Sequence, residues 1–273
     1  MTYQDKLKKQ LSEYKLHELD IAEPGFHKGK YEVQTYQHIL PRTEEGRNLL
    51  AAARPRGMTF LKANPRKRHQ YFHHLNSSQA FTFNLFFPHF DSGGSAASSL
   101  LRAFGRGHKL AAWELEAVPL PNEGTNIDAS WTTADGEKTI CEVKVSENDF
   151  GSAKVDARHL DKLSMIYQPV LQGNVVPACL ETKEFFRGYQ FYRNVWHLVQ
   201  RDVNRLVFLL PRANRPLWKK VHDLRSKVLG HVSPRISIVA IEDVLSALIA
   251  DSCNPAMLRE HAKQMARKYL ISE

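Results

Sequence analysis

The chain has 273 residues, enough for one large domain or two small ones. Hydrophobic residues make up 42% of it and charged residues 25%, the balance of a soluble globular protein, and no apolar run is long enough to cross a bilayer. The formal net charge of +9 favours an anionic partner, with nucleic acid ahead of an acidic membrane surface.

The start of the chain and its cysteines indicate the compartment. No basic segment followed by an apolar one opens the chain, so no signal peptide is expected. The three cysteines, Cys141, Cys179 and Cys253, are odd in number and far apart, which suits a reducing compartment. We therefore expect a cytoplasmic protein.

The N-terminal part contains two helical patterns. Leucines at helical spacing predict a helix over residues 3–20. Residues 26–40 give no clear pattern. A threonine followed by two glutamates predicts a short helix over residues 43–53, because a hydroxyl caps a helix and acids suit its first turn.

A basic stretch without acids comes next, with prolines at 55 and 65 that argue against one long helix. It is either a patch that contacts phosphates or a solvated basic loop. Its basic residues are Arg54, Arg56, Lys62, Arg66, Lys67 and Arg68.

Two further helices precede the strands. Ser77 or Ser78 caps a buried, phenylalanine-rich helix that we expect Pro88 to end. A second helix is predicted over residues 96–104, closed by Gly105.

Three strands are predicted over residues 112–118, 126–132 and 140–146. Side chains alternate between the two faces of a strand, and each of these segments alternates apolar with polar residues. Asp135-Gly136 lies between the second and third segments, and such a pair favours a tight hairpin turn. The last two strands should therefore be antiparallel neighbours.

The polar faces of these strands carry acids. Asp128 is on the second strand, Glu142 and Lys144 are on the third, and Glu114 and Glu116 are on the first. Covered carboxylates are costly unless they are paired or bind a cation, and Mg²⁺ needs only one or two protein carboxylates because it keeps several waters. Lys144 could then orient or deprotonate a water, or stabilise charge on the phosphate. An exposed ladder of ion pairs is the alternative.

The remaining elements alternate between helix and strand, which favours a mixed central sheet with helices on both faces. The helix over 181–200 carries Gln190, Arg193 and Asn194 on one face, at i, i+3 and i+4. Helices are predicted over 155–167, 181–200, 216–229, 242–250 and 255–270, and strands over 206–210 and 235–241.

Asp128, the hairpin and Glu142-Val143-Lys144 resemble the signature of PD-(D/E)XK nucleases, which are restriction-endonuclease-like proteins. The order of elements is similar to their αβββαβ core, and the helices with Ser78-Gln79 and Tyr189 to Asn194 are closest to a bacterial branch. Asn126-Ile127 replaces the proline that gives the motif its name.

The resemblance implies roles for residues. Asp128, Glu142 and the Val143 carbonyl would bind Mg²⁺, with Mn²⁺ able to substitute, and Lys144 would assist the attacking water. Glu116 fits an additional acid, with Glu114 as the competing choice, and Gln190 fits a helix residue of the site. Candidates for nucleic-acid binding are Arg54, Arg56, Arg66, Lys67, Arg68, Arg193 and Asn194.

These expectations define the predicted organisation. The fold is α/β, with a restriction-endonuclease-like core at about 77–210 and helical extensions at both ends. Residues 1–56 form an N-terminal helical extension and 57–273 the nuclease domain.

The first functional hypothesis is a Mg²⁺-dependent nuclease that hydrolyses DNA in restriction, defence or repair, with RNA as an alternative substrate. The second is a nucleic-acid-binding protein with an inactive nuclease fold. A hydrolase using Glu114 and Glu116 as an acid/base pair ranks last, because two acids on one strand do not flank a scissile bond. Endo or exo action and a homodimer stay open.

Overall fold

The computed structural model describes residues 1–28, 32–107, 109–121, 123–201 and 203–271. The chain divides into two compact units. The first unit comprises Met1–Leu110 and Ala240–Glu273, and the second unit comprises Ala111–Val239. The domain boundary expected after residue 56 stays a prediction.

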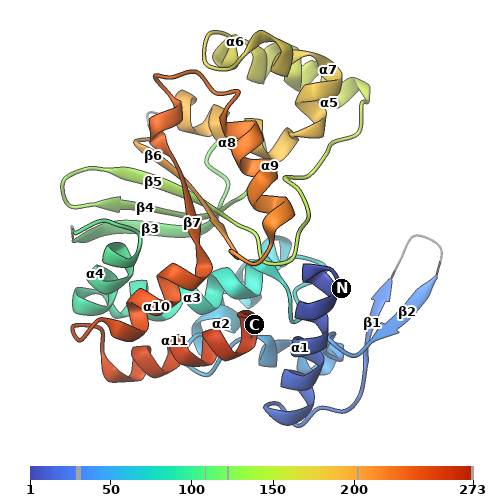
Figure 1. Cartoon of the computed structure of the whole chain (residues 1–273), viewed down its shortest axis with the longest axis vertical. Coiled ribbons are helices and arrows are strands. Elements are labelled where there is room, and N and C mark those ends of the chain that lie inside the picture. The colour runs from blue at the N-terminus through green and yellow to red at the C-terminus, as the bar shows by residue number, and fades with distance from the viewer. Residues whose placement is uncertain (29–31, 108, 122, 202, 272–273) are drawn as a thin grey trace. The chain divides into compact units, whose positions relative to one another are not determined.

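The second unit is built on an open, five-stranded mixed sheet with the order β3-β4-β5-β6-β7 (Figure 1). Strands β4 and β5 are antiparallel, whereas β5 and β6 are parallel. The predicted mixed α/β fold is therefore confirmed. The strands are β3 (Leu110–Ala117), β4 (Ile127–Thr133), β5 (Lys138–Val143), β6 (Arg205–Leu210) and β7 (Ile236–Ala240).

The hairpin between β4 and β5 forms where the sequence predicts it. Gly136 has φ +85°, the left-handed conformation that a residue with a side chain rarely adopts. The register places Ala129 opposite Cys141 and Trp131 opposite Thr139. Burial alternates along β4, as the apolar and polar alternation predicts.

Helices of the second unit pack on one face of the sheet through a shared apolar core. Phe208 of β6 stacks on Phe191 of α8 with ring centroids 5.2 Å apart, and Ile140 belongs to the same core. Residues facing each other in a parallel pair share a face, and Glu142 pairs with Phe208, so Glu142 also faces α8. The helical elements are α5 (Ala157–Lys162), a π-helix (Leu163–Tyr167), α6 (Gln168–Leu171), η4 (Pro177–Leu180), α7 (Thr182–Arg187), α8 (Tyr189–Gln200), α9 (Arg215–Arg225) and η5 (Ser233–Arg235).

The single helix predicted over 181–200 is wrong, because the structure has two helices that meet at Gly188. A Cβ on Gly188 would lie 3.0 Å from the Tyr192 ring and 3.1 Å from Leu224, so only glycine fits there without displacing neighbours. The break turns the Gln190 N–H toward the Phe150 carbonyl at 3.0 Å. It thereby fixes the start of α8 against the segment that follows β5.

The first unit is mainly helical. The stretch that sequence could not assign contains a two-stranded antiparallel sheet, β1-β2. Its elements are α1 (Tyr3–His17), β1 (Gly25–Lys28), β2 (Val33–Tyr36), η1 (Arg42–Asn48), α2 (Arg54–Ala63), η2 (Pro65–Lys67), α3 (Ser78–Ser92), α4 (Gly94–Ala103), α10 (Ile241–Ala250) and α11 (Ala256–Tyr269).

Two helix boundaries predicted in the first unit are wrong. Helix α3 continues through Pro88 to Ser92. Proline has no N–H to donate to the carbonyl of residue 84, and His261 Nε2 contacts that carbonyl at 2.7 Å, so the lost hydrogen bond is replaced. The helix predicted over 43–53 is instead the 3-10 helix η1, and α2 begins only at Arg54. Among the described helices, none is both long and apolar enough to span a bilayer.

Candidate active site

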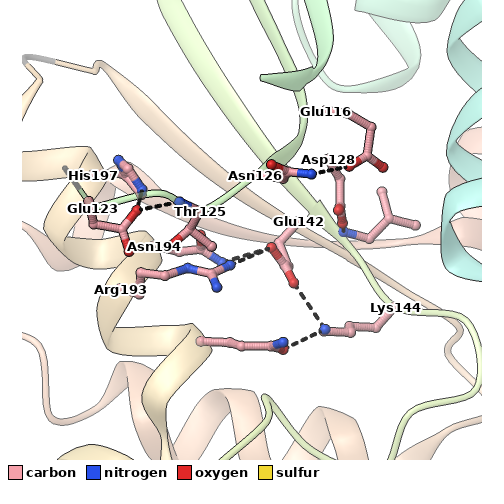
Figure 2. A network of polar contacts seen from close by, with 12 residues as sticks. Glu116, Glu123, Thr125, Asn126, Asp128, Glu142, Lys144, Arg193, Asn194 and His197 are labelled. Carbon is pink, nitrogen blue, oxygen red and sulfur yellow. Dashed lines mark hydrogen bonds and ion pairs between the residues drawn. The ribbon is translucent and has the colours of Figure 1, made fainter. Parts of the chain in front are cut away.

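Asp128 and Glu142 come together at one end of β4 and β5 (Figure 2). The last paired residues at this end are Ala129 and Cys141, so the next pair in the same register is Asp128 and Glu142. Residues directly opposite each other in an antiparallel pair share a face. Asp128 Oδ2 accepts a 2.8 Å hydrogen bond from the Val143 N–H, which holds this carboxylate beside the end of β5.

Glu142 is enclosed by donors from α8 and by Lys144. Its Oε1 lies 3.0 Å from Lys144 Nζ, and its Oε2 accepts a 3.0 Å hydrogen bond from Asn194 Nδ2. Arg193 lies 3.8 Å from the same Oε2. Glu142 is 5% exposed and Lys144 7%, so the alternative of an exposed ion-pair ladder does not describe these residues.

Lys144 is held by a second partner on α8, although β5 ends one residue earlier, at Val143. Its Nζ donates a 2.6 Å hydrogen bond to Gln190 Oε1, and its N–H still donates to the Leu209 carbonyl at 3.1 Å. Gly151, with φ +61°, lies against Gln190, where a Cβ would come 2.7 Å from Gln190 Cδ. The segment after β5 thus fixes the glutamine that holds the lysine.

The three predicted residues of the α8 face do converge on the site, as their i, i+3 and i+4 spacing predicts. Gln190 contacts Lys144, and Arg193 and Asn194 contact Glu142. Arg193 is 7% exposed and Asn194 2%, so both are engaged inside the unit.

The two central carboxyl groups differ in pKa because their charged neighbours differ. Burial, then the charges of Glu142 and Glu116, raise the pKa of Asp128 well above its usual value. Burial also opposes ionisation of Glu142, but the charges of Lys144 and Arg193 outweigh it and lower the pKa of Glu142. A proton in this pair therefore resides on Asp128.

Lys144 remains an ammonium in this environment. Burial lowers the pKa of Lys144, but the carboxylates of Glu142 and Glu147 outweigh it, and the net pKa lies above the usual value. A charged lysine can donate hydrogen bonds and stabilise negative charge, but it cannot accept a proton.

Glu116 is the acid of β3 that acts on Asp128. It is fully buried, and its Oε2 accepts a 3.0 Å hydrogen bond from Asn126 Nδ2 (Figure 2). Its φ of 53° is unusual for a residue with a side chain and interrupts the alternation of β3. Glu114, the competing acid, is exposed, and the acids whose charges raise the pKa of Asp128 are Glu142 and Glu116.

A further buried acid, Glu123, was not identified from the sequence. It is 1% exposed and accepts hydrogen bonds from the Thr125 N–H at 3.0 Å and the Tyr167 hydroxyl at 2.6 Å. His197, also buried, lies 3.4 Å from its Oε2 and is one turn beyond Arg193 on α8 (Figure 2). Glu123 therefore links the connection between β3 and β4 to the helix that holds Glu142. It lies in an irregular segment, so no periodic pattern could have indicated it.

The predicted basic stretch belongs to the first unit and is partly occupied by intramolecular contacts. Arg56 pairs with Asp91 at 3.2 Å, and Arg68 pairs with Glu45 at 2.7 Å. The Lys67 ammonium lies 5.7 Å from the centre of the Phe60 ring. The stretch is not one loop, since Arg54 and Arg56 open α2, and Arg66 and Lys67 lie in η2.

The donor set fits a hard divalent cation. Asp128 and Glu142 supply carboxylate oxygens, the ligands that such a cation prefers, and the charge of Glu116 acts on Asp128. Within the described ranges, no three His, Cys, Asp or Glu side chains already form a metal-holding group. Mg²⁺ does not require one, because two carboxylates and waters are enough.

Comparison with protein families finds a match that covers residues 8–270. Its description is restriction endonuclease associating with ARP. The chain belongs to this family. Membership confirms the predicted resemblance to restriction-endonuclease-like nucleases. Comparisons with curated proteins and with solved structures found no match.

Proposed function

We propose that this member of the restriction endonuclease family is a metal-dependent nuclease of the PD-(D/E)XK type that hydrolyses DNA phosphodiester bonds in restriction, defence or repair. The observation that carries the proposal is the position of Asp128 opposite Glu142, beside Lys144, under α8. Family membership supports a nuclease-like role, and the net charge of +9 supports a polyanionic substrate.

Asp128 and Glu142 would hold Mg²⁺ or Mn²⁺, together with the main-chain carbonyl of Val143. When bound, the cation supplies charge neutralisation at the phosphate and a lower pKa for a bound water. Burial and the charges of Glu142 and Glu116 raise the pKa of Asp128, and a bound cation would offset these effects, which supports this assignment. Glu116 rather than Glu114 is the additional acid, since it is the one that acts on Asp128.

Lys144 would orient the attacking water and stabilise charge on the phosphate as an ammonium. The raised pKa of Lys144 supports this role over that of a general base. The sequence motif alone left both roles open. Gln190 would keep the ammonium in place through the 2.6 Å hydrogen bond. Arg193 and Asn194 would hold Glu142 rather than contact bases, whereas Arg54, Arg56, Arg66, Lys67 and Arg68 remain our candidates for contacts with nucleic-acid phosphates.

The competing function is a nucleic-acid-binding protein without turnover. The observation that favours it is that both carboxylate oxygens of Glu142 already contact protein groups. That protein would bind DNA in a salt-dependent way, because it would release counterions, but would cleave nothing.

Incubation of the purified protein with plasmid and linear DNA decides between the two functions. The nuclease predicts cleavage with Mg²⁺ or Mn²⁺, none with a chelator, and none for Asp128→Ala or Glu142→Ala, while both variants still bind DNA. Parallel reactions with RNA test the alternative substrate. Binding without cleavage under every metal would contradict the nuclease assignment.

A further inference from the structure

A basic cavity of about 230 Å³ lies in the first unit and is not part of the candidate active site. Arginines from three separate elements line it: Arg47 of η1, Arg54 of α2 and Arg267 of α11. Tyr14 of α1 also lines it. Helices α1 and α11 pack against each other, so residues far apart in the sequence form one wall.

The charges of the three guanidinium groups all affect one side chain, the Tyr14 phenol. Burial and the nearby charge of Glu18 raise the pKa of the Tyr14 phenol, and the charges of all three arginines oppose that rise. Among the described residues that line the cavity, Glu18 is the single acid. The wall therefore carries an excess of positive charge.

The arginines differ in how far their charge is already compensated. Arg47 lies 3.7 Å from Glu44, and Arg267 lies 3.0 Å from Glu260. Arg54 donates from Nε to the Leu49 carbonyl at 3.0 Å and has no carboxylate partner among the described residues. Its two terminal amino groups can therefore meet an anion.

A buried lysine lies beside Tyr14 and contacts neutral acceptors. Lys268 is fully buried, and its ammonium lies 5.7 Å from the centre of the Tyr14 ring. It donates to the carbonyl and the side-chain oxygen of Asn48, at 2.6 and 2.7 Å, and both acceptors are neutral. Burial and then the charge of Arg54 lower the pKa of Lys268. The positive charge of Arg54 thus reaches the interior behind Tyr14 and disfavours a second cation there.

We propose that this cavity, lined by Arg47, Arg54, Arg267 and Tyr14, binds the phosphate group of a nucleotide. Guanidinium groups match phosphate oxygens with paired hydrogen bonds. Its volume is below the ~300 Å³ at which pockets for larger organic ligands begin, so it suits a compact anion. A terminal phosphate carries a charge of about −1.5 to −2 near pH 7 and compensates the site better than a singly charged phosphodiester. The ligand is therefore a terminal phosphate, of a free nucleotide or of a nucleic-acid end.

Calorimetric titration of the whole protein with inorganic phosphate and with adenosine 5′-monophosphate tests this proposal. A chelator is present throughout, so binding at the candidate active site does not contribute. We expect saturable binding of both ligands, weakened about tenfold or more in Arg54→Gln and in Arg267→Gln, and partly retained in Arg54→Lys. Arg259→Gln is the matched control, since Arg259 also lies in α11, does not line the cavity and bonds backbone carbonyls. Arg267 is more than half exposed, which keeps the test valid if Arg54→Gln fails to fold.

A pair of single-stranded oligonucleotides with a 5′-phosphate or a 5′-hydroxyl distinguishes the two sources of phosphate. Tighter binding of the phosphorylated strand that disappears in Arg54→Gln assigns the site to nucleic-acid ends. Equal binding of both strands, with nucleotide binding intact, assigns it to free nucleotides. Absence of saturable phosphate and nucleotide binding, or an equal loss in Arg259→Gln, overturns the proposal. None of these outcomes depends on cleavage, so the nuclease assignment stands or fails separately.

Discussion

The ammonium of Lys144 donates a 2.6 Å hydrogen bond to the side-chain oxygen of Gln190, which joins the end of β5 to the first turn of α8. Gly151 makes this bond possible, because a Cβ at that position would lie 2.7 Å from Gln190 Cδ. The lysine of the motif is therefore positioned by a segment that the motif does not include.

Gly151→Ala should displace Gln190 and loosen Lys144. We expect kcat for DNA cleavage to fall by about tenfold, equivalent to ~1.4 kcal/mol of lost transition-state stabilisation, with little change in KM. Gly173→Ala is the control, since Gly173 also has a positive φ, of +78°, but a Cβ there meets nothing within 4 Å. Equal losses in both variants would mean that backbone strain, not Gln190, is responsible.

Glu123→Gln should weaken the link between the β3–β4 connection and α8. Removing a buried charged acceptor with several partners costs about 1–3 kcal/mol, measurable by urea unfolding at pH 7. Glu181→Gln, an exposed acid in the same unit, should cost little. If the free energy of unfolding, the affinity for Mn²⁺ and kcat are all unchanged in Glu123→Gln, then Glu123 does not position the site.

Glu123 also predicts a pH dependence. Although burial opposes ionisation, the close contact with His197 and hydrogen bonds from Thr125 and Tyr167 lower the pKa of Glu123 from 4.5 to about 2. The folded state thus holds this proton more weakly than the unfolded chain. The contribution to stability is complete above pH 4.5 and is lost as the pH falls toward 2. A plot of unfolding free energy against pH should be less steep in this range for Glu123→Gln than for the unchanged protein.

Metal binding should release a proton from Asp128. Because the pKa of Asp128 is raised, the metal-free folded state holds that proton more strongly than the unfolded chain does, and it loses this stability as the pH rises through the folded pKa. A cation binds the ionised form, so affinity should increase with pH. Calorimetry with Mn²⁺ in buffers of different ionisation enthalpy measures the released proton, which should be absent in Asp128→Asn.

The same titration distinguishes the two acids of β3. Glu116→Gln removes a charge that raises the pKa of Asp128, so less proton should be released at a given pH. Glu114→Gln should release as much as the unchanged protein. If instead Glu114→Gln releases less proton than Glu116→Gln, Glu114 is the additional acid.

Local patterns allowed much of the second unit to be predicted from the sequence. Alternation placed Asp128 and Glu142 on one face, Asp135-Gly136 indicated the turn that sets their register, and helical spacing brought Gln190, Arg193 and Asn194 together. Each of these relationships spans few residues or one regular element.

The features that the sequence did not reveal depend on the three-dimensional structure rather than on a local pattern. The continuation of α3 through Pro88 depends on His261, which is far along the chain. Likewise, the turn of Glu116 into the site depends on a positive φ, and Glu123 gains its partners from α8 and the π-helix. A residue pattern cannot report contacts made between such distant segments.

The most direct test of the central claim is anomalous diffraction from crystals soaked in Mn²⁺. We predict one strong peak within coordination distance of the carboxylates of Asp128 and Glu142, and its loss in Asp128→Asn crystals. A map without a peak at these two carboxylates, from crystals that diffract well and contain millimolar Mn²⁺, would contradict the metal-dependent mechanism.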